Sequence, residues 1–180
     1  MKKTLALTLL SVILSCTAFS QLMVSKLVGK DAGNSKLGGG IFTYLDFPIG
    51  SADNQSLRLE ILDFAYYPTR YPDIDATIGY LSIKAGYKYV FSETQQGIYV
   101  EPAAGYCRVV NSNNANPNAA SYGDGIALAL EVGYSLEVGQ NENSINFGLK
   151  YESDQAGSIF VANSVAFRVS FSFHLFRRKD

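Results

Sequence analysis

One segment near the end of the chain alternates so strictly that it predicts a β-strand. Residues 164–176 have the sequence SVAFRVSFSFHLF. Successive side chains of a strand point to opposite faces, so Phe167, Val169 and Phe171 share one face. The opposite face carries small or polar residues together with Arg168. The segment therefore predicts a strand with one wholly apolar face, and the fold depends on which face meets the surroundings.

The N-terminal segment has the layout of a secretory signal peptide. Two lysines precede a short apolar run, and residues 18–20 fit a small-x-small cleavage site before Gln21. The apolar run is too short for a helix that crosses a membrane. We therefore interpret residues 1–20 as a signal peptide and residues 21–180 as one domain.

The two cysteines bear on how this signal is processed. The residues around Cys16 look like a lipoprotein box, so lipidation at Cys16 is the alternative to cleavage before Gln21. Ordinary cleavage is favoured. It leaves Cys107 as the single cysteine of the mature chain, which excludes an intrachain disulfide and makes an inert small side chain the favoured interpretation.

Period-two alternation, broken by turn-rich clusters, recurs along the rest of the chain without a helical pattern of useful length. We predict eight strands, at 22–30, 36–47, 57–67, 77–91, 97–110, 122–138, 144–152 and 159–176. The strands follow one another directly, and no second domain is indicated. The pattern favours an all-β, antiparallel, up-and-down arrangement in which the last strand pairs with the first.

Three local features refine this assignment. The alternation slips at Ile61-Leu62, which predicts a β-bulge. Pro102 lies inside a predicted strand, so we expect a local break in pairing there. The three glycines at 38–40 suit a close approach of neighbouring strands better than a nucleotide-binding loop, because no helix follows them.

The two faces of the predicted strands differ in size as well as polarity. The large apolar side chains of every strand would overfill the narrow interior of an eight-stranded barrel. The small and charged side chains fit inside, where opposite charges can pair, and the apolar face then meets lipid. The sequence therefore predicts a transmembrane β-barrel with a closed polar interior. Its interior charge network comprises Arg58, Glu60, Asp63, Lys84, Lys88, Glu101, Glu131, Glu137, Lys150 and Arg168.

Aromatic residues gather where a membrane would have its two interfaces. If both termini lie on the periplasmic side, one group falls near the outer interface: Tyr66, Tyr67, Tyr71, Tyr106, Tyr122 and Tyr151. The other falls near the inner interface: Phe47, Tyr87, Tyr89, Phe91, Tyr134, Phe171, Phe173 and Phe176. The segments at 68–75, 111–121 and 153–158 then become extracellular loops, of which 111–121 is the longest.

The mature chain resembles the small outer-membrane β-barrel proteins, the OmpA-domain and OmpX-like group, and is most similar to variants from Bacteroidota. The alternating aromatic residues of the last strand, ending at Phe176, carry the resemblance, and Arg177 to Asp180 follow them. The resemblance implies an outer-membrane location in a Gram-negative cell envelope. It also implies outer-membrane lipid and the barrel-assembly machinery as partners, and an extracellular ligand of unknown identity.

Candidate residues for chemistry are few. Ser170, Ser172 and His174 share one strand face, but side chains two apart on a strand are roughly 7 Å apart, beyond direct hydrogen bonding. We therefore predict no catalytic residue. One histidine and one mature cysteine give no metal site and no cofactor site, and a formal net charge of −1 gives no basic excess for nucleic acid.

The hypothesis is a non-enzymatic barrel with a structural or adhesive role through its extracellular loops. The alternatives left open are a narrow pore or small-solute transporter, a soluble lipocalin-like periplasmic carrier of an apolar ligand, and, last, a lipid-A-modifying enzyme.

Overall fold

The structure is a computed structural model that describes residues 21–29, 32–33, 35–49, 54–69, 76–93, 96–113, 121–138, 143–156 and 160–172. The predicted signal peptide, Cys16, His174 and Phe176 lie outside the described residues. The strands are β1 (Gln21–Val28), β2 (Gly38–Pro48), β3 (Gln55–Pro68), β4 (Ala76–Val90), β5 (Gly97–Asn113), β6 (Ser121–Val138), β7 (Asn143–Ala156) and β8 (Phe160–Ser172).

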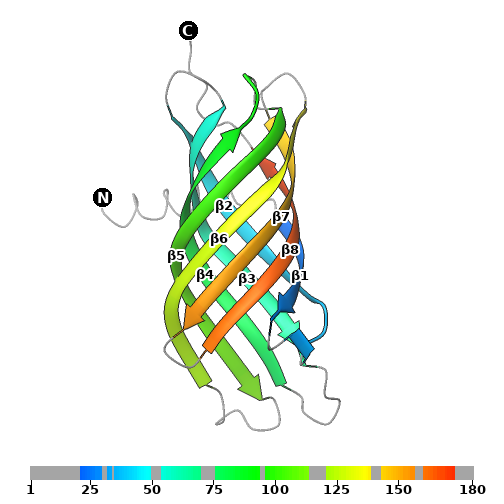
Figure 1. Cartoon of the computed structure of the whole chain (residues 1–180), viewed down its shortest axis with the longest axis vertical. Coiled ribbons are helices and arrows are strands. Elements are labelled where there is room, and N and C mark those ends of the chain that lie inside the picture. Colours follow the sequence, from blue (N-terminus) through cyan, green and yellow to red (C-terminus); the bar gives the residue numbers. More distant parts are fainter. Residues whose placement is uncertain are drawn as a thin grey trace, which may run out of the picture.

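Each strand pairs antiparallel with its neighbours in sequence, and β8 pairs with β1 to close the barrel (Figure 1). This confirms the eight-stranded antiparallel barrel and its predicted closure. We call the end at which β1 begins and β8 ends the terminal rim, and the opposite end the distal rim. No helix within the described residues has the length and apolar character needed to cross a membrane.

The outer surface of the barrel is apolar and the lumen is charged. Large apolar side chains that point outward, such as Ile126 and Leu149, are each 59 % exposed. Inward-pointing charged side chains, such as Arg58 and Lys84, are almost completely buried. The structure therefore confirms the inverted distribution predicted from the two strand faces, with small and charged residues inside.

The predicted bulge in β3 is confirmed and has a clear effect on the lumen. Glu60 pairs with Lys84 and Asp63 pairs with Ser82, so β3 advances by one residue more than β4 between these pairs. Residues three apart in a regular strand point to opposite faces. The extra residue at the bulge returns Asp63 to the same face as Glu60, and both carboxylates are buried in the lumen.

Two further local predictions are confirmed. The pairing of β4 with β5 lapses between the pairs Gly86 with Ala103 and Tyr89 with Val100, which is where Pro102 lies. A Cβ added at Gly40 would collide with the carbonyl oxygen of Phe64 and with the Met23 side chain. The glycine therefore permits the close approach of β2 to its neighbours.

The strand ends differ from prediction near the distal rim. The expected loop at 153–158 is wrong over its first part, because β7 continues to Ala156. Asp154 continues the inward alternation there, so a polar residue that faces the lumen resembles a loop residue in the sequence. The expected loop at 111–121 is likewise shorter, since β5 ends at Asn113 and β6 begins at Ser121.

One residue of the predicted outer aromatic group belongs inside. Tyr66, Tyr106 and Tyr151 are exposed on the outer surface, whereas Tyr67 is 1 % exposed and packs against Tyr80 in the lumen. Tyr66 and Tyr67 are adjacent in a strand and cannot point to the same face.

Candidate functional site

Large inward side chains on some strands occupy the space that small inward residues on other strands leave in the lumen. On β6 and β7, Gly133 and Gly148 leave the space that Tyr99 occupies, because a Cβ at either position would collide with the Tyr99 side chain. The Tyr99 hydroxyl donates a hydrogen bond to Glu131 Oε1 at 2.5 Å. Small inward residues on the long strands thus make room for buried polar groups.

Two groups of ion pairs lie in the middle of the lumen, one around Arg58 and the other around Lys84, Lys150 and Arg168. Together we call them the ion-pair belt, which consists of Asp46, Arg58, Glu60, Asp63, Lys84, Glu101, Glu131, Lys150, Glu152 and Arg168. Its side chains come from every strand except β1. The belt therefore ties distant parts of the wall together.

The two arginines of the belt each join two carboxylates from different strands. Arg58 binds Asp46 through Nε and Nη2 at 2.7 and 3.0 Å and reaches Glu101 through Nη1 at 2.7 Å. Arg168 binds Glu131 at 2.9 Å and Glu60 at 3.0 Å. The planar guanidinium presents several donors in fixed directions, which suits this bridging role.

Aromatic rings cover the same two arginines. The Arg58 guanidinium carbon lies 3.7 Å from the centre of the Tyr44 ring, and that of Arg168 lies 3.4 Å from the centre of the Phe42 ring. Cation–π contacts of this kind are strongest where water is excluded. The rings stabilise the arginines and fill the space beside them.

The two lysines of the belt share one group of carboxylates. Lys84 Nζ lies 3.0 Å from Glu60 Oε1, 2.8 Å from Asp63 Oδ2 and 2.8 Å from Glu152 Oε1. Lys150 forms ion pairs with the same three carboxylates. The bulge in β3 is what brings Glu60 and Asp63 into this group together.

The belt fills the middle of the lumen with buried, paired charges. The belt charges are buried away from water. The desolvation cost of each charge is therefore offset by its ion-pair partners and not by solvent. A hydrated ion that crossed the belt would have to separate several buried ion pairs. Within the described part of the chain, the middle of the barrel is thus a polar core of paired charges.

The structure places nearly all of the predicted interior charges in the lumen. Eight of the ten belong to the belt. Lys88 is buried outside the belt, toward the terminal rim, where its Nζ donates to Asn146 Oδ1 at 2.7 Å and lies 4.6 Å from the centre of the Tyr99 ring. Glu137 is a correction, because its side chain is exposed near the end of β6 and takes no part in the belt.

The predicted charge network omitted three carboxylates of the lumen: Asp46, Glu152 and Asp154. The alternation alone could have found two of them. Asp46 has the same phase as Tyr44, and Glu152 has the same phase as Lys150. Asp154 lay in a segment predicted to be a loop, so no strand phase was assigned to it.

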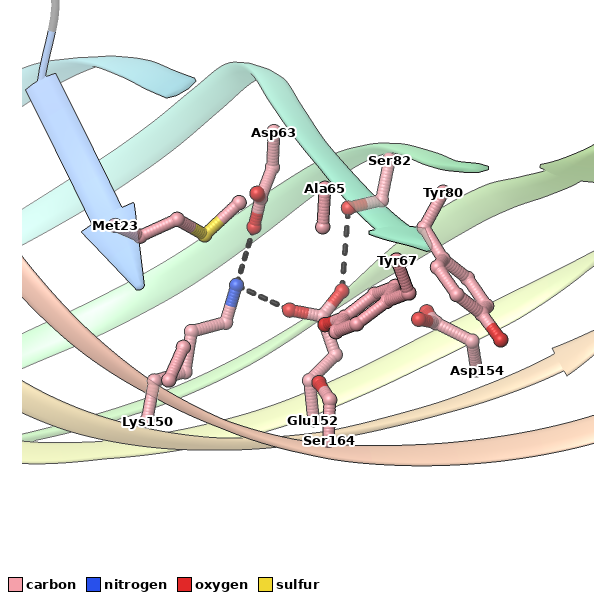
Figure 2. A pocket seen from close by; sticks show the side chains of 11 residues that line it. Met23, Asp63, Ala65, Tyr67, Tyr80, Ser82, Lys150, Glu152, Asp154 and Ser164 are labelled. Carbon is pink, nitrogen blue, oxygen red and sulfur yellow. Dashed lines mark hydrogen bonds and ion pairs between the residues drawn. The ribbon is translucent and has the colours of Figure 1, made fainter. Parts of the chain in front are cut away.

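A small pocket adjoins the belt on its distal side (Figure 2). Lys150 stands at one end, with ion pairs to Asp63 and Glu152, and Asp154 lies at the other end with Tyr80. The pocket has room for about one water molecule. Charged and hydroxyl-bearing side chains line this space, among them Asp63, Tyr80 and Asp154.

Ser170 and Ser172 belong to a hydrogen-bond network with Tyr44 and Asn146. The Tyr44 hydroxyl lies 2.9 Å from Ser170 Oγ and 2.7 Å from Ser172 Oγ, and Asn146 Nδ2 donates to Ser172 Oγ at 2.9 Å. Among the residues that the structure describes, no three His, Cys, Asp or Glu side chains are grouped so as to hold a metal ion.

Comparisons with known proteins agree with this architecture. No protein-family model matches the chain, and no curated protein matches its sequence. The structure is similar to that of Neisserial surface protein A, with a TM-score of 0.60 and 15 % identity over 84 % of this chain and 92 % of that one. The chain has the fold of a small outer-membrane barrel.

A second solved structure has the same fold. Ail, the attachment invasion locus protein of Yersinia pestis, matches with a TM-score of 0.54 and 12 % identity over 86 % of this chain and 94 % of that one. Its structure was solved in complex with the heparin analogue sucrose octasulfate. At these identities the likeness concerns the fold, and it leaves the function to be argued from this chain.

Proposed function

We propose that this chain is a non-enzymatic integral protein of a bacterial outer membrane, exported by its signal peptide and inserted by the barrel-assembly machinery. The observation that carries the proposal is the pairing of an apolar outer surface with a buried charged lumen. A wall in which residues such as Ile126 and Leu149 are more than half exposed would be unfavourable in water. In lipid the same surface is favourable.

The positions of aromatic residues support an orientation. Phe47, Tyr87 and Tyr134 are exposed near the terminal rim, and Tyr66, Tyr106 and Tyr151 are exposed toward the distal rim. Two aromatic bands flank the apolar wall, as expected at two membrane interfaces. The terminal rim is then periplasmic, and the distal rim faces outside the cell.

The first experiment tests membrane insertion. Membranes from cells that express the full chain are solubilised in mild detergent and run on a gel with and without boiling. A folded barrel gives a band that shifts on heating. Recovery of the protein in the soluble fraction without detergent would instead support the periplasmic carrier, although a charged lumen suits an apolar ligand poorly.

The second experiment tests whether the lumen is closed. The purified barrel is inserted into a planar bilayer, and its conductance is measured against the same bilayer without protein. We expect no single-channel steps, because the belt fills the lumen with paired charges. Regular conductance steps would favour the narrow pore.

The proposed structural or adhesive role concerns the segments that join the strands at the distal rim. β5 and β6 are the longest strands, with 17 and 18 residues, and they carry the segment at 114–120. An adhesive role predicts that a Gly-Ser segment of equal length at 114–120 reduces binding of the barrel to immobilised heparin, the kind of ligand found with Ail. Equal and negligible binding by both proteins would favour a purely structural role.

A further inference from the structure

Asp154 is a buried carboxylate with one oxygen atom that lacks a hydrogen-bond partner in the described part of the chain. It points inward from the distal part of β7 and is 4 % exposed. Its Oδ1 atom has no hydrogen-bond partner among the described residues. A buried carboxylate oxygen without a partner is costly, and each such case calls for an explanation.

The cations nearest to Asp154 are already engaged by other carboxylates. Lys84 and Lys150 both bind Glu60, Asp63 and Glu152, and no ion pair within 4.0 Å joins either of them to Asp154 among the described residues. Figure 2 shows Asp154 at the opposite end of the pocket from Lys150. Neither lysine therefore forms a direct ion pair with this carboxylate.

The described lumen as a whole has more acids than bases. The inward carboxylates are Asp46, Glu60, Asp63, Glu101, Glu131, Glu152 and Asp154, and the inward cations are Arg58, Lys84, Lys88, Lys150 and Arg168. This is a formal excess of two negative charges. Uncompensated charge of one sign in a low-dielectric lumen favours the binding of a mobile counter-ion.

The pocket supplies both the space and the chemistry for such an ion. Asp154 lines it together with the hydroxyl-bearing residues Tyr67, Tyr80, Ser82 and Ser164. Carboxylate, hydroxyl and water oxygens are the ligands that hard cations prefer. A calcium ion takes six to eight oxygens and commonly several carboxylates, whereas this pocket has one available carboxylate oxygen and room for about one water molecule.

We propose that this pocket binds one monovalent hard cation, with sodium as the fitting size, between the Asp154 carboxylate and the surrounding hydroxyl groups. The ion would complete the partners of Asp154 and offset part of the negative excess of the lumen. The site is distinct from the belt, because the belt carboxylates are held by protein cations. It depends on the closed lumen and not on what the loops bind.

Thermal unfolding of the detergent-solubilised full barrel tests the proposal. The midpoint is measured in increasing NaCl, with N-methylglucamine chloride added to keep the ionic strength constant at one pH. We expect the midpoint of the wild type to rise and saturate with sodium, since a ligand that binds only the folded state stabilises it. Asp154→Asn should remove this dependence, and it should be at least as stable as the wild type without sodium.

Glu137→Gln is the matched control, because it removes one carboxylate from an exposed position of the same barrel. It should retain the sodium dependence of the wild type. If Asp154→Asn does not fold, Ser164→Ala provides a second variant, for which the half-saturating sodium concentration should rise at least about tenfold. Sodium NMR gives an independent measurement of binding. The wild type should broaden the sodium signal, and Asp154→Asn should not.

Two outcomes would overturn the proposal. The midpoint of the wild type could be the same in sodium and in N-methylglucamine while it rises on acidification, which would mean that Asp154 takes up a proton only. Alternatively, Asp154→Asn could keep the full sodium dependence, which would place the ion elsewhere.

Discussion

The barrel contains ion pairs of similar geometry in two very different settings. Arg168 binds Glu131 at 2.9 Å inside the lumen, and all of the side chains involved are nearly fully buried. Arg108 binds Asp124 at 2.8 Å on the outer surface, where the two side chains are 50 % and 48 % exposed. The distances alone do not distinguish the two pairs.

The two pairs differ in their exposure to water and in the number of ion-pair partners of the arginine. Water can solvate either member of the exposed pair when the other is lost, so the pair contributes little. Arg168, in contrast, pairs with Glu60 and Glu131, which are both buried. If Arg168 were lost, solvent would not compensate the charge of either carboxylate. The comparison therefore predicts that ion pairs stabilise this fold mainly where the wall excludes solvent.

The strongest way to break the comparison is to exchange the inner and outer faces of one strand. Deleting Ile83 shifts the alternation of β4 by one residue on one side of the deletion. Either Lys84 and Lys88 then point outward, or the inward and outward side chains of the residues before Ile83 exchange faces. We expect no folded barrel, as judged by the loss of the heat-dependent band shift.

Deletion of Ile61 is the matched control, because it also removes one isoleucine. Ile61 is the extra residue of the bulge, so its loss leaves Glu60 and Asp63 on the same face with one residue between them. The band shift should remain. Equal damage by both deletions would contradict this explanation of the bulge.

The next largest effect should come from Arg168→Met, which leaves Glu60 and Glu131 without their shared base. We expect a loss of about 3–5 kcal/mol in the free energy of unfolding, the range for breaking a buried ion pair. Urea unfolding in lipid vesicles, followed by tyrosine fluorescence, measures it. Adding Glu60→Gln and Glu131→Gln should recover part of the loss, and a cost near that of a surface pair would contradict the role of the belt.

Lys88→Met should have a smaller effect. Lys88 donates to the neutral Asn146 amide and faces the Tyr99 ring, so its removal leaves one amide oxygen and no carboxylate without a partner. We expect a cost of about 1–2 kcal/mol from the lost hydrogen bond. The same unfolding experiment applies, and a cost as large as that of Arg168→Met would show that Lys88 belongs to the belt.

Arg108→Met should have the smallest effect. The exposed pair with Asp124 is worth up to about 1 kcal/mol, and salt screens it. The difference between wild type and variant should therefore shrink further in high salt. A cost of several kcal/mol would mean that the outer surface stabilises the barrel through charges as strongly as the lumen does.

Much of this architecture could be predicted because a strand has only two faces. Period-two alternation located all eight strands, and the size of the apolar set indicated that it faces outward. The slip at Ile61-Leu62 predicted the bulge, since a shift of phase is visible in a single strand. These are local patterns, and local patterns are what a sequence displays directly.

The partners within the lumen could not be predicted in the same way. Which base meets which acid depends on the stagger of strands that lie far apart in sequence, as in the contact of Arg168 with Glu60. Glu137 has the inward phase, but it lies too close to the rim to be covered. Asp154 was missed because a polar residue near a strand end resembles a loop residue.

The first strand differs from the others in how it is held. β1 turns Gln21, Met23, Ser25 and Leu27 into the lumen and directs its only charge, Lys26, outward. It pairs with β2 only from Gln21 to Ser25 and contributes nothing to the belt. The junction between β1 and β2 is therefore where the wall can open at the smallest cost, and amide hydrogen exchange in the folded barrel should begin there.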